Sequence, residues 1–295
     1  GSNQVDLGGI SLPASAISIS SRRVVGYIEN ARHISSLTLL SSYYMGYMTC
    51  IFSILYFLVF YIGCQNEPYD IRTPYKLDEN GNKLYTIKSK ILGSNFLRSG
   101  FTFAFSSIAA AGLVAVTLIP TYFILKNCSA TSGTFPETYK SYFSIFDFLA
   151  NHLAYLDPTI RSSGEDVLPN IYCGILPVML VPLYIFSNKI SGKEKVFSCG
   201  ILGIMFASCY TNYLNYIWHG FHFPNDLPYR FSYMYSFLLL ILAFRAFTFI
   251  KEYTRRQIIG VGVATVFFVI MVQEIGSKNF SEVGVWICIA FIGIY

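Results

Sequence analysis

Charge is what this sequence has least of. Only 13% of its 295 residues are Asp, Glu, Lys or Arg, whereas 54% are hydrophobic. An average soluble domain carries roughly 25% charged residues, which help to cover its apolar core. This chain has too little polar material for such a shell, so lipid is the simplest solvent for the apolar excess. The composition therefore excludes a soluble globular domain.

Recognisable catalytic motifs are also missing. The chain has no GxGxxG, Walker, HExxH or GxSxG pattern. None of its seven cysteines forms a CxxC pair, so a zinc site is not expected. Most of them lie in apolar runs, where Cys acts as a small hydrophobe, although Cys128 and Cys173 could share one side of a membrane and pair. The net charge of +5 comes without a Lys/Arg-rich run interleaved with aromatics, so nucleic-acid binding is not indicated.

Long hydrophobic runs are what the sequence has in abundance. A transmembrane helix needs about 17 to 25 apolar residues at 1.5 Å rise per residue. In lipid the backbone must bond to itself, so each run should be helical, and barrel strands need only about 10 alternating residues. The predicted fold class is therefore all-α, a polytopic membrane protein with about seven transmembrane helices. The runs cover residues 37–62, 96–125, 171–186, 196–217, 231–250 and 258–275, and a last one begins near residue 283.

Lys and Arg concentrate in every other loop, as the positive-inside rule requires. The loops after the first, third and fifth runs are the basic ones. Loops 126–170, 218–230 and 276–282 carry fewer Lys and Arg for their length. We therefore expect the N-terminal segment and these three loops to face outward. The basic loops contain Arg72, Lys76, Lys83, Lys88 and Lys90, then Lys189, Lys193 and Lys195, and finally Lys251, Arg255 and Arg256.

We expect residues 1–295 to form a single transmembrane domain that is a fragment of a longer protein. Residues 1–34 would be part of an outer loop, and 126–170 a second, long outer loop. Within the latter, residues 139–153 place aromatics and Leu at helical spacing. This pattern predicts an amphipathic helix lying in the outer membrane interface. We find no internal repeat, so an inverted-repeat transporter has no support.

The most informative polar segment is NYLNYIWHGFHFPNDLPYR, residues 212–230. His219 and His222 are three residues apart, the spacing of neighbours on one helical turn, and Pro224 ends such a helix. One reading is a polar pocket at the membrane surface. Arg230 would bind a phosphate oxygen through its planar fork, and either histidine would donate a hydrogen bond or act as acid or base near pH 7.

The other reading of this segment is an interfacial belt. Trp, Tyr and His sit naturally at headgroup depth, and an Arg at a helix end reaches to water. Two histidines without a third ligand do not predict a metal site. Arg245 and Glu274 are interpreted as charges that reach to the two membrane surfaces from helix ends. Four loop acids are either solvated or supply a base or a ligand for a divalent cation: Asp147, Asp157, Glu165 and Asp166.

Several segments together resemble a known family. NYIWHGFHFPNDLPYRFSYMYSFLLL (215–240) is similar to a W-H-G, P, P-Y-R-F-S pattern, and LPNIYCGILPVMLVPLYIF (168–186) to an N-x-Y-x-G helix entry. SSYYMGYMTCIFSILYF (41–57) matches a Y-Y-x-G-Y-M helix, and GLVAVTLIPT (112–121) fits a fourth segment. Along the chain these segments fall in the same order as in the YfhO family of bacterial membrane proteins, which they resemble and which has the GT-C glycosyltransferase fold.

The resemblance implies an activity. GT-C enzymes transfer one sugar from a lipid-phosphate donor, typically a polyprenyl-phosphate sugar, to an acceptor on the outer face of the membrane. YfhO-type members are associated with sugar decoration of cell-envelope polymers, teichoic acids among them. The implied protein is a multi-pass glycosyltransferase of the bacterial cell membrane, with a polyprenyl-phosphate sugar, a cell-envelope polymer and membrane lipid as its partners and with no nucleic acid.

Under this interpretation Arg230 binds the donor phosphate, with His219 and His222 beside it as catalytic candidates. Trp218 and Tyr229 would stack on a sugar ring, and Asp226 completes the substrate-binding set. The family's base or metal-binding Asp is expected upstream of this chain, since Asp6 lies in no acid motif. The sequence leaves the cofactor open, a divalent cation being one candidate.

Two other functions stay open from the sequence. A transporter or flippase of a lipid-linked substrate would need polar residues in the middle of its helices, and here nearly all polar groups are at the ends. A non-catalytic scaffold of an envelope-assembly complex would be favoured if the upstream loop lacked any Asp or Glu. The sequence does not identify the sugar or the acceptor.

Overall fold

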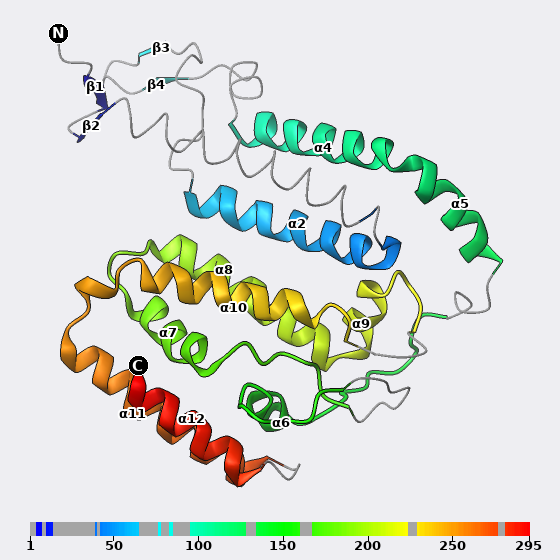
Figure 1. Cartoon of the computed structure of the whole chain (residues 1–295). Coiled ribbons are helices and arrows are strands. Elements are labelled where there is room, and N and C mark those ends of the chain that lie inside the picture. Colours follow the sequence, from blue (N-terminus) through cyan, green and yellow to red (C-terminus); the bar gives the residue numbers. More distant parts are fainter. Residues whose placement is uncertain are drawn as a thin grey trace. The chain divides into compact units, whose positions relative to one another are not determined.

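The computed structural model describes residues 4–7, 10–13, 39, 42–64, 76–77, 83–84, 95–127, 134–159, 167–223, 229–276 and 281–295. These residues are mainly helical, as predicted (Figure 1). The strands among them form two small antiparallel pairs, β1 (Gln4–Leu7) with β2 (Ile10–Pro13) and β3 (Lys76–Leu77) with β4 (Lys83–Leu84). The chain divides into two compact units, Gly1–Thr121 and Tyr122–Tyr295, each of which has its own contacts.

The first unit is built on α2 (Tyr43–Cys64) and α4 (Asn95–Leu113), which pack through aromatic rings. Phe57 stacks on Phe103 with ring centres 4.5 Å apart, and Tyr61 meets Phe96 edge-on at 5.2 Å. Such ring pairs contribute stability beyond that from burying their apolar area. The predicted run 96–125 is not one continuous helix. A turn at Val114 separates α4 from α5 (Ala115–Lys126), which contains Pro120.

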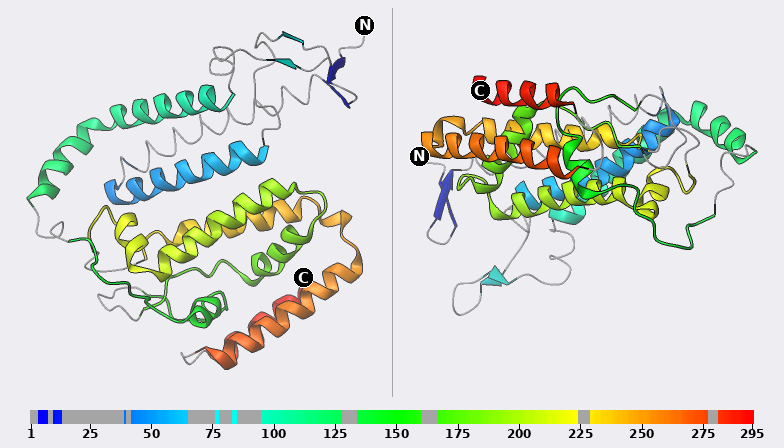
Figure 2. Two further views of the ribbon diagram at one scale, coloured as in Figure 1. Left: turned by 180° about the vertical axis from the view of Figure 1, so that it is seen from behind. Right: turned by 90° about the horizontal axis from the view of Figure 1, so that it is seen from below.

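The second unit is a helical bundle. Its long helices are α7 (Ile175–Phe186), α8 (Gly192–Tyr210), α10 (Ser232–Phe247), α11 (Arg255–Ile275) and α12 (Glu282–Ile294), joined by the short α6 (Ile145–Ala150), α9 (Asn212–Trp218) and η2 (Ile250–Glu252). Helices α8 and α10 lie side by side and antiparallel, and α11 runs beside α12 (Figure 2). Helix α7 contacts α10, α11 and α12, so it is the central element of the bundle.

Two apolar clusters among the described residues of this unit both include α7. In one, Leu180, Leu183 and Tyr184 pack against Leu242 and Ala246 of α10. The other joins α7 to the long α11–α12 pair and to the segment after α6, and its buried members are Leu153, Ala154, Ile175, Met179, Val269, Val285, Cys288 and Ile292. Gly284 allows the close approach of α12, because a Cβ there would lie 2.3 Å from the Ala154 carbonyl oxygen.

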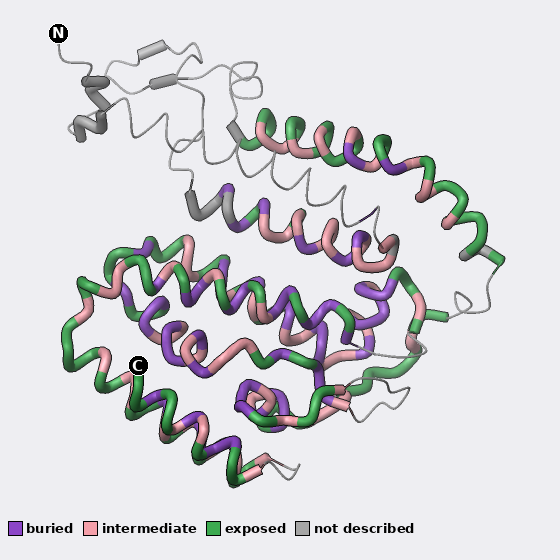
Figure 3. Tube along the Cα trace, in the orientation of Figure 1, coloured by how far each residue is buried: buried purple, intermediate pink, exposed green. Residues whose placement is uncertain are grey.

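The outer faces of these helices are exposed (Figure 3), and many of their exposed side chains are apolar. Val263 and Phe267 on α11, Phe244 on α10 and Trp286 on α12 are each between 65% and 69% exposed. Soluble proteins rarely expose contiguous apolar patches of this kind, whereas lipid covers them at no cost. The exposed faces agree with a membrane protein.

Two described helices are long and apolar enough to cross a membrane, Phe96–Leu113 and Arg255–Ile275. The other apolar helices are shorter: Tyr44–Val59, Ala115–Ile124, Ile175–Phe186, Ser232–Phe247 and Glu282–Ile294. The expectation of about seven spans, and of one transmembrane domain over the whole chain, stays a prediction.

Three expected helices differ in extent from the prediction. The run 171–186 is helical only from Ile175, because an extended segment ending at Gly174 (φ 100°) precedes it. The run 196–217 is interrupted at Thr211, which separates α8 from α9. The helix predicted over 139–153 is formed only at Ile145–Ala150, and 139–144 runs without helical structure beside the α8–α9 break.

Candidate functional site

The break between α8 and α9 is where the site begins. Thr211 adopts an extended conformation (φ −111°, ψ 141°) and forms a β-bridge with Ser141. The Asn212 side chain accepts from the Lys140 N–H at 3.1 Å and donates to the Thr138 carbonyl at 2.8 Å. The loop before α6 is thereby fixed against the break, which gives α9 a new direction toward Trp218 and His219 (Figure 1).

Trp218 is held inside this turn. Its side chain is only 3% exposed, and its Nε1–H donates to the Ser208 hydroxyl at 2.8 Å. The indole stacks on Phe231 with ring centres 5.2 Å apart. Tyr229 is also buried and meets Phe143 and Tyr142 edge-on. The structure thus gives both rings a packing role, and their stacking on a sugar stays a prediction.

His219 is fully buried. Its Nδ1 lies 2.8 Å from the Asn215 carbonyl oxygen, which can only accept, so Nδ1 carries the proton and Nε2 presents a lone pair. Burial, with smaller contributions from the charges of His222 and Arg230, lowers the pKa of His219 to about 4, against the effect of the Asn215 bond. His219 is therefore neutral at pH 7. Of the roles predicted for it, only those of a neutral imidazole fit this environment.

His222 and Arg230 are closer to solvent than His219. Arg230 is exposed and His222 half-buried, on either side of residues 224–228. Both charges act on His219, so the structure brings the three predicted basic residues within electrostatic range of one another. Asp226, the remaining predicted binding residue, lies outside the described residues. We name residues 219–222 together with 229–230 the His–Arg end.

A second buried histidine, His152, was not singled out from the sequence. His152 follows α6, and its Nδ1 is 3.2 and 3.1 Å from the carbonyl oxygens of Phe148 and Leu149. Its Nε2 is 3.0 Å from the Tyr235 hydroxyl, in the first turn of α10. Burial lowers the pKa of His152 to about 4, against the effect of the two backbone bonds. An Asn-His pair in an otherwise apolar segment was the available signal.

The extended segment before α7 is fixed by side chains from two directions. Thr159 and Asn170 exchange hydrogen bonds, from the Thr159 N–H to Asn170 Oδ1 at 2.9 Å and from Asn170 Nδ2 to the Thr159 carbonyl at 2.8 Å. From α10, Ser232 donates to the Asn170 carbonyl and Ser236 to the Ile171 carbonyl. These bonds satisfy a backbone that has no helical partners. They explain the polar residues of LPNIYCG and of RFSYMYS in physical terms.

A cavity of about 290 Å³ lies among α7, α8, α10 and α11. His152 and Tyr235 contribute to its wall. The described residues that line it are Leu149, His152, Val178, Val181, Pro182, Leu202, Tyr235, Leu239, Ala264, Thr265 and Phe268. It is a different site from the His–Arg end, whose residues do not line it.

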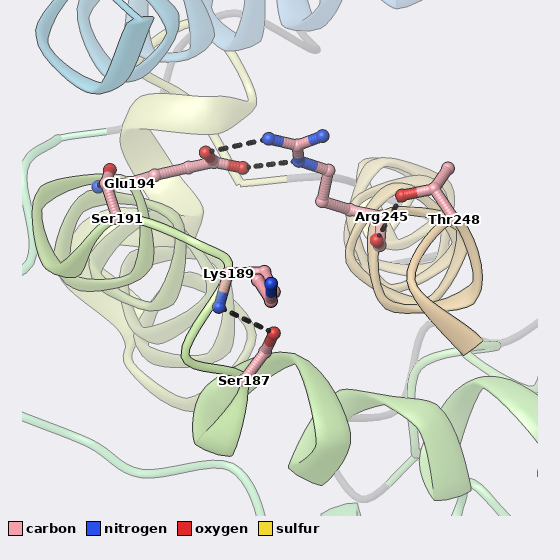
Figure 4. A network of polar contacts seen from close by, with 6 residues as sticks. All are labelled: Ser187, Lys189, Ser191, Glu194, Arg245 and Thr248. Carbon is pink, nitrogen blue, oxygen red and sulfur yellow. Dashed lines mark hydrogen bonds and ion pairs between the residues drawn. The ribbon is translucent and has the colours of Figure 1, made fainter. Parts of the chain in front are cut away.

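The opposite ends of α8 and α10 are strongly charged. Arg245 donates from Nε to Glu194 Oε1 at 2.9 Å and from Nη2 to Oε2 at 3.3 Å (Figure 4). Lys189 pairs with Glu252 at 3.0 Å, and the Lys195 ammonium donates to the Ser187 carbonyl. Arg245 was expected to reach to the membrane surface from the end of its helix, and the structure adds a two-point ion pair with Glu194 of α8. We name residues 187–195 together with 245–256 the Lys–Arg end.

Metal and disulfide chemistry gain no support. Among the described residues, no group of three or more His, Cys, Asp or Glu side chains is placed to hold a metal ion. Cys128 lies outside the described residues, so its pairing with Cys173 stays a prediction. Asp147 is buried at the start of α6, whereas Asp157 is exposed; Glu165 and Asp166 lie outside the described residues.

Apolar helices with exposed apolar faces, and a cationic end opposite a histidine-rich one, define a helical membrane protein. The family model described as "Bacterial membrane protein YfhO" matches residues 26–295. The chain therefore belongs to the YfhO family of bacterial membrane proteins, as its sequence motifs indicated. No curated protein and no solved structure matches the chain.

Proposed function

We propose that the protein is a multi-pass membrane glycosyltransferase of GT-C type. It transfers a sugar from a polyprenyl-phosphate donor to a cell-envelope acceptor, such as teichoic acid, on the outer face of the membrane. The observation that supports this most is the contrast between the two ends of the α8–α10 pair. The Lys–Arg end carries ion-paired cations, and the His–Arg end gathers His219, His222 and Arg230.

Membrane orientation follows from this contrast. Lys and Arg are retained on the cytoplasmic side, so the Lys–Arg end is placed inside and the His–Arg end outside. The distance between the two ends is also close to the thickness of a bilayer's hydrocarbon core. The 16 residues of α10 span about 24 Å at 1.5 Å per residue, near the roughly 30 Å of a bilayer's hydrocarbon core. The His–Arg end then lies at headgroup depth, where the phosphate of a lipid-linked donor is found.

The chemistry assigns each basic residue a separate task. In the transfer, the acceptor oxygen bonds to the sugar's anomeric carbon as the bond from that carbon to the phosphate oxygen breaks. The acceptor's proton goes to a base, and polyprenyl phosphate leaves as an anion. Exposed Arg230 stabilises the phosphate charge, with His222 beside it. Buried neutral His219 is too weak a base for this proton, so it positions a hydroxyl through Nε2, and a carboxylate of the kind that the family resemblance implies acts as the base.

The first experiment is a deletion of the gene in its own cell. Sugar on the envelope polymers and polyprenyl-phosphate sugar in each leaflet are quantified. A transferase predicts lost decoration with donor accumulating in the outer leaflet. Lost decoration with donor retained in the inner leaflet would indicate a flippase, and no change in either quantity would remove the enzyme and leave the scaffold.

A labelling experiment tests the orientation separately. In a cysteine-free background, Phe223→Cys places a thiol at the His–Arg end and Lys251→Cys one at the Lys–Arg end; both positions are exposed. A membrane-impermeant maleimide added to intact cells should label the first and not the second. Labelling of Lys251→Cys alone would invert the orientation and place the proposed site in the cytoplasm.

A further inference from the structure

The cavity beside His152 has the size of a small-ligand site. An apolar cavity of about 150 Å³ is known to take up benzene, so one of about 290 Å³ holds a molecule of roughly a dozen heavy atoms. Its volume is close to the lower limit of about 300 Å³ for ligand pockets. Most of the wall is aliphatic or aromatic, which favours a hydrocarbon body.

The wall is also uncharged. Among the described residues that line the cavity, none is Asp, Glu, Lys or Arg, and His152 is buried and bonded as a neutral imidazole. A charged group placed there would lose its hydration without gaining a counter-charge, which is costly. The occupant is therefore neutral, unlike the phosphate proposed at the His–Arg end.

Each polar side chain of the wall already uses its hydrogen. Carbonyl oxygens only accept, so the Nδ1–H of His152 is directed to the carbonyls of Phe148 and Leu149. Its Nε2 then has only a lone pair, so the Tyr235 hydroxyl donates to it at 3.0 Å. The Thr265 hydroxyl donates to the Val261 carbonyl at 2.8 Å. The oxygens of Tyr235 and Thr265 are left as acceptors.

The acceptor oxygens of the wall come from two helices. Tyr235 lies on α10 and Thr265 on α11, and both residues line the cavity. Among the described residues of the wall, the side-chain donors are all engaged.

We infer that this cavity binds a neutral, mainly hydrocarbon molecule bearing a hydroxyl group, which donates its O–H to the acceptor oxygens of the wall. Ala264, on the lining, is itself exposed, and its neighbours Val263 and Phe267 on α11 are exposed apolar residues. The ligand therefore enters from lipid through the side of α11. This site is separate from the proposed transfer chemistry and does not depend on it.

Binding is tested with radiolabelled 1-decanol and the purified full chain in lipid nanodiscs. Unlabelled 1-decanol, decyl methyl ether and decyl phosphate serve as competitors with the same hydrocarbon body. The ether has an oxygen but no donor, so it should compete about tenfold more weakly than the alcohol. Equal competition by the ether would overturn the need for a donor, and strongest competition by the phosphate would overturn the neutral site.

Two tryptophan variants locate the binding. Ala264→Trp fills the entrance of the cavity, whereas Val263→Trp places the same bulk at an adjacent exposed position that does not line it. Both positions are at the surface, so neither change disturbs the buried core. Loss of at least tenfold in decanol affinity is expected for Ala264→Trp alone. Equal affinity in the two variants would place decanol binding elsewhere and overturn the assignment.

Discussion

The two ends of the α8–α10 pair accommodate their polar residues in different ways. At the Lys–Arg end, cations stay partly exposed and acids pair with them, as Arg245 does with Glu194. At the His–Arg end, His219 is buried and neutral, whereas Arg230 is exposed and His222 half-buried. The Lys–Arg end holds its charges in ion pairs, and the His–Arg end combines a buried neutral imidazole with a cation nearer to solvent. This difference is why we propose the recognition site at the His–Arg end.

Removing an exposed cation from each end in turn tests whether the two ends differ in function. Arg230→Ala should lower sugar transfer at least about a hundredfold, because a positioned charge on the leaving phosphate is worth several kcal/mol in the transition state. Membrane insertion should be unchanged. Transfer is measured with a radiolabelled polyprenyl-phosphate sugar and purified acceptor.

Arg255→Ala is the matched control, since Arg255 is exposed at the Lys–Arg end. It should transfer sugar at the normal rate. Normal transfer by Arg230→Ala, with insertion intact, would show that the phosphate-binding role is wrong.

The buried histidines should make the protein sensitive to acid. The pKa of His152 is about 4 in the folded state, below its ordinary value of 6.5. Between these values the unfolded state binds a proton that the folded state excludes, so stability is full above pH 6.5 and falls as the pH drops toward 4. The loss approaches about 3 kcal/mol for His152. Thermal unfolding in detergent from pH 7.5 to 4.5 measures it.

His152→Gln should be less stable at pH 7.5 yet show a shallower decline with pH. His222→Gln, which changes the half-buried histidine, is the comparison variant. An unchanged slope in His152→Gln would show that His152 is not the group that titrates.

The Glu194–Arg245 pair should contribute less to the free energy of unfolding than His152 does, because both side chains are partly solvated. The Arg245 side chain is 39% exposed and that of Glu194 18%. Arg245→Met leaves Glu194 without its partner and should cost about 1–2 kcal/mol. The double variant with Glu194→Gln should recover part of that loss, because no uncompensated charge remains. Unfolding midpoints of the two single variants and the double variant give the coupling; strict additivity would mean that the pair has none.

The smallest effect is expected at the start of α11, also at the Lys–Arg end. Thr254 and Gln257 form a capping box in which the threonine hydroxyl accepts from the Gln257 N–H at 3.3 Å. Thr254→Ala should lower the free energy of unfolding by about 1 kcal/mol. Thr254→Ser keeps the cap and should be nearly neutral, so an equal loss in both would assign the effect to another property of Thr254.

Sequence reasoning identified the helical elements better than their ends. The runs 37–62 and 231–250 correspond to α2 and α10, because long apolar stretches have few alternatives to a helix. The breaks at Val114 and Thr211 were missed. At this second break, Thr211 forms a β-bridge with Ser141 and Asn212 accepts a hydrogen bond from Lys140. These partners are about 70 residues away, and hydropathy does not encode such contacts.

The candidate site could be predicted only in part, because some of its properties are local in sequence and others depend on packing. His219, His222 and Arg230 are near one another in the chain, so their grouping could be read from spacing. The neutral state of His219 could not be predicted from spacing, because it depends on burial. His152 and Tyr235 are 83 residues apart and meet only through the packing of α6 on α10.

The sequence by itself determined that this is a helical membrane protein of the YfhO family, since composition, run length and local motifs are properties of the chain. The alternation of basic loops likewise gave an orientation to test. The tertiary structure alone decided which polar groups are charged, paired or neutral, because a side chain's protonation and hydrogen bonds depend on partners and burial. That is why Arg245 forms an ion pair, His219 is a neutral residue near an exposed Arg230, and the side-chain donors of the described cavity wall are already engaged.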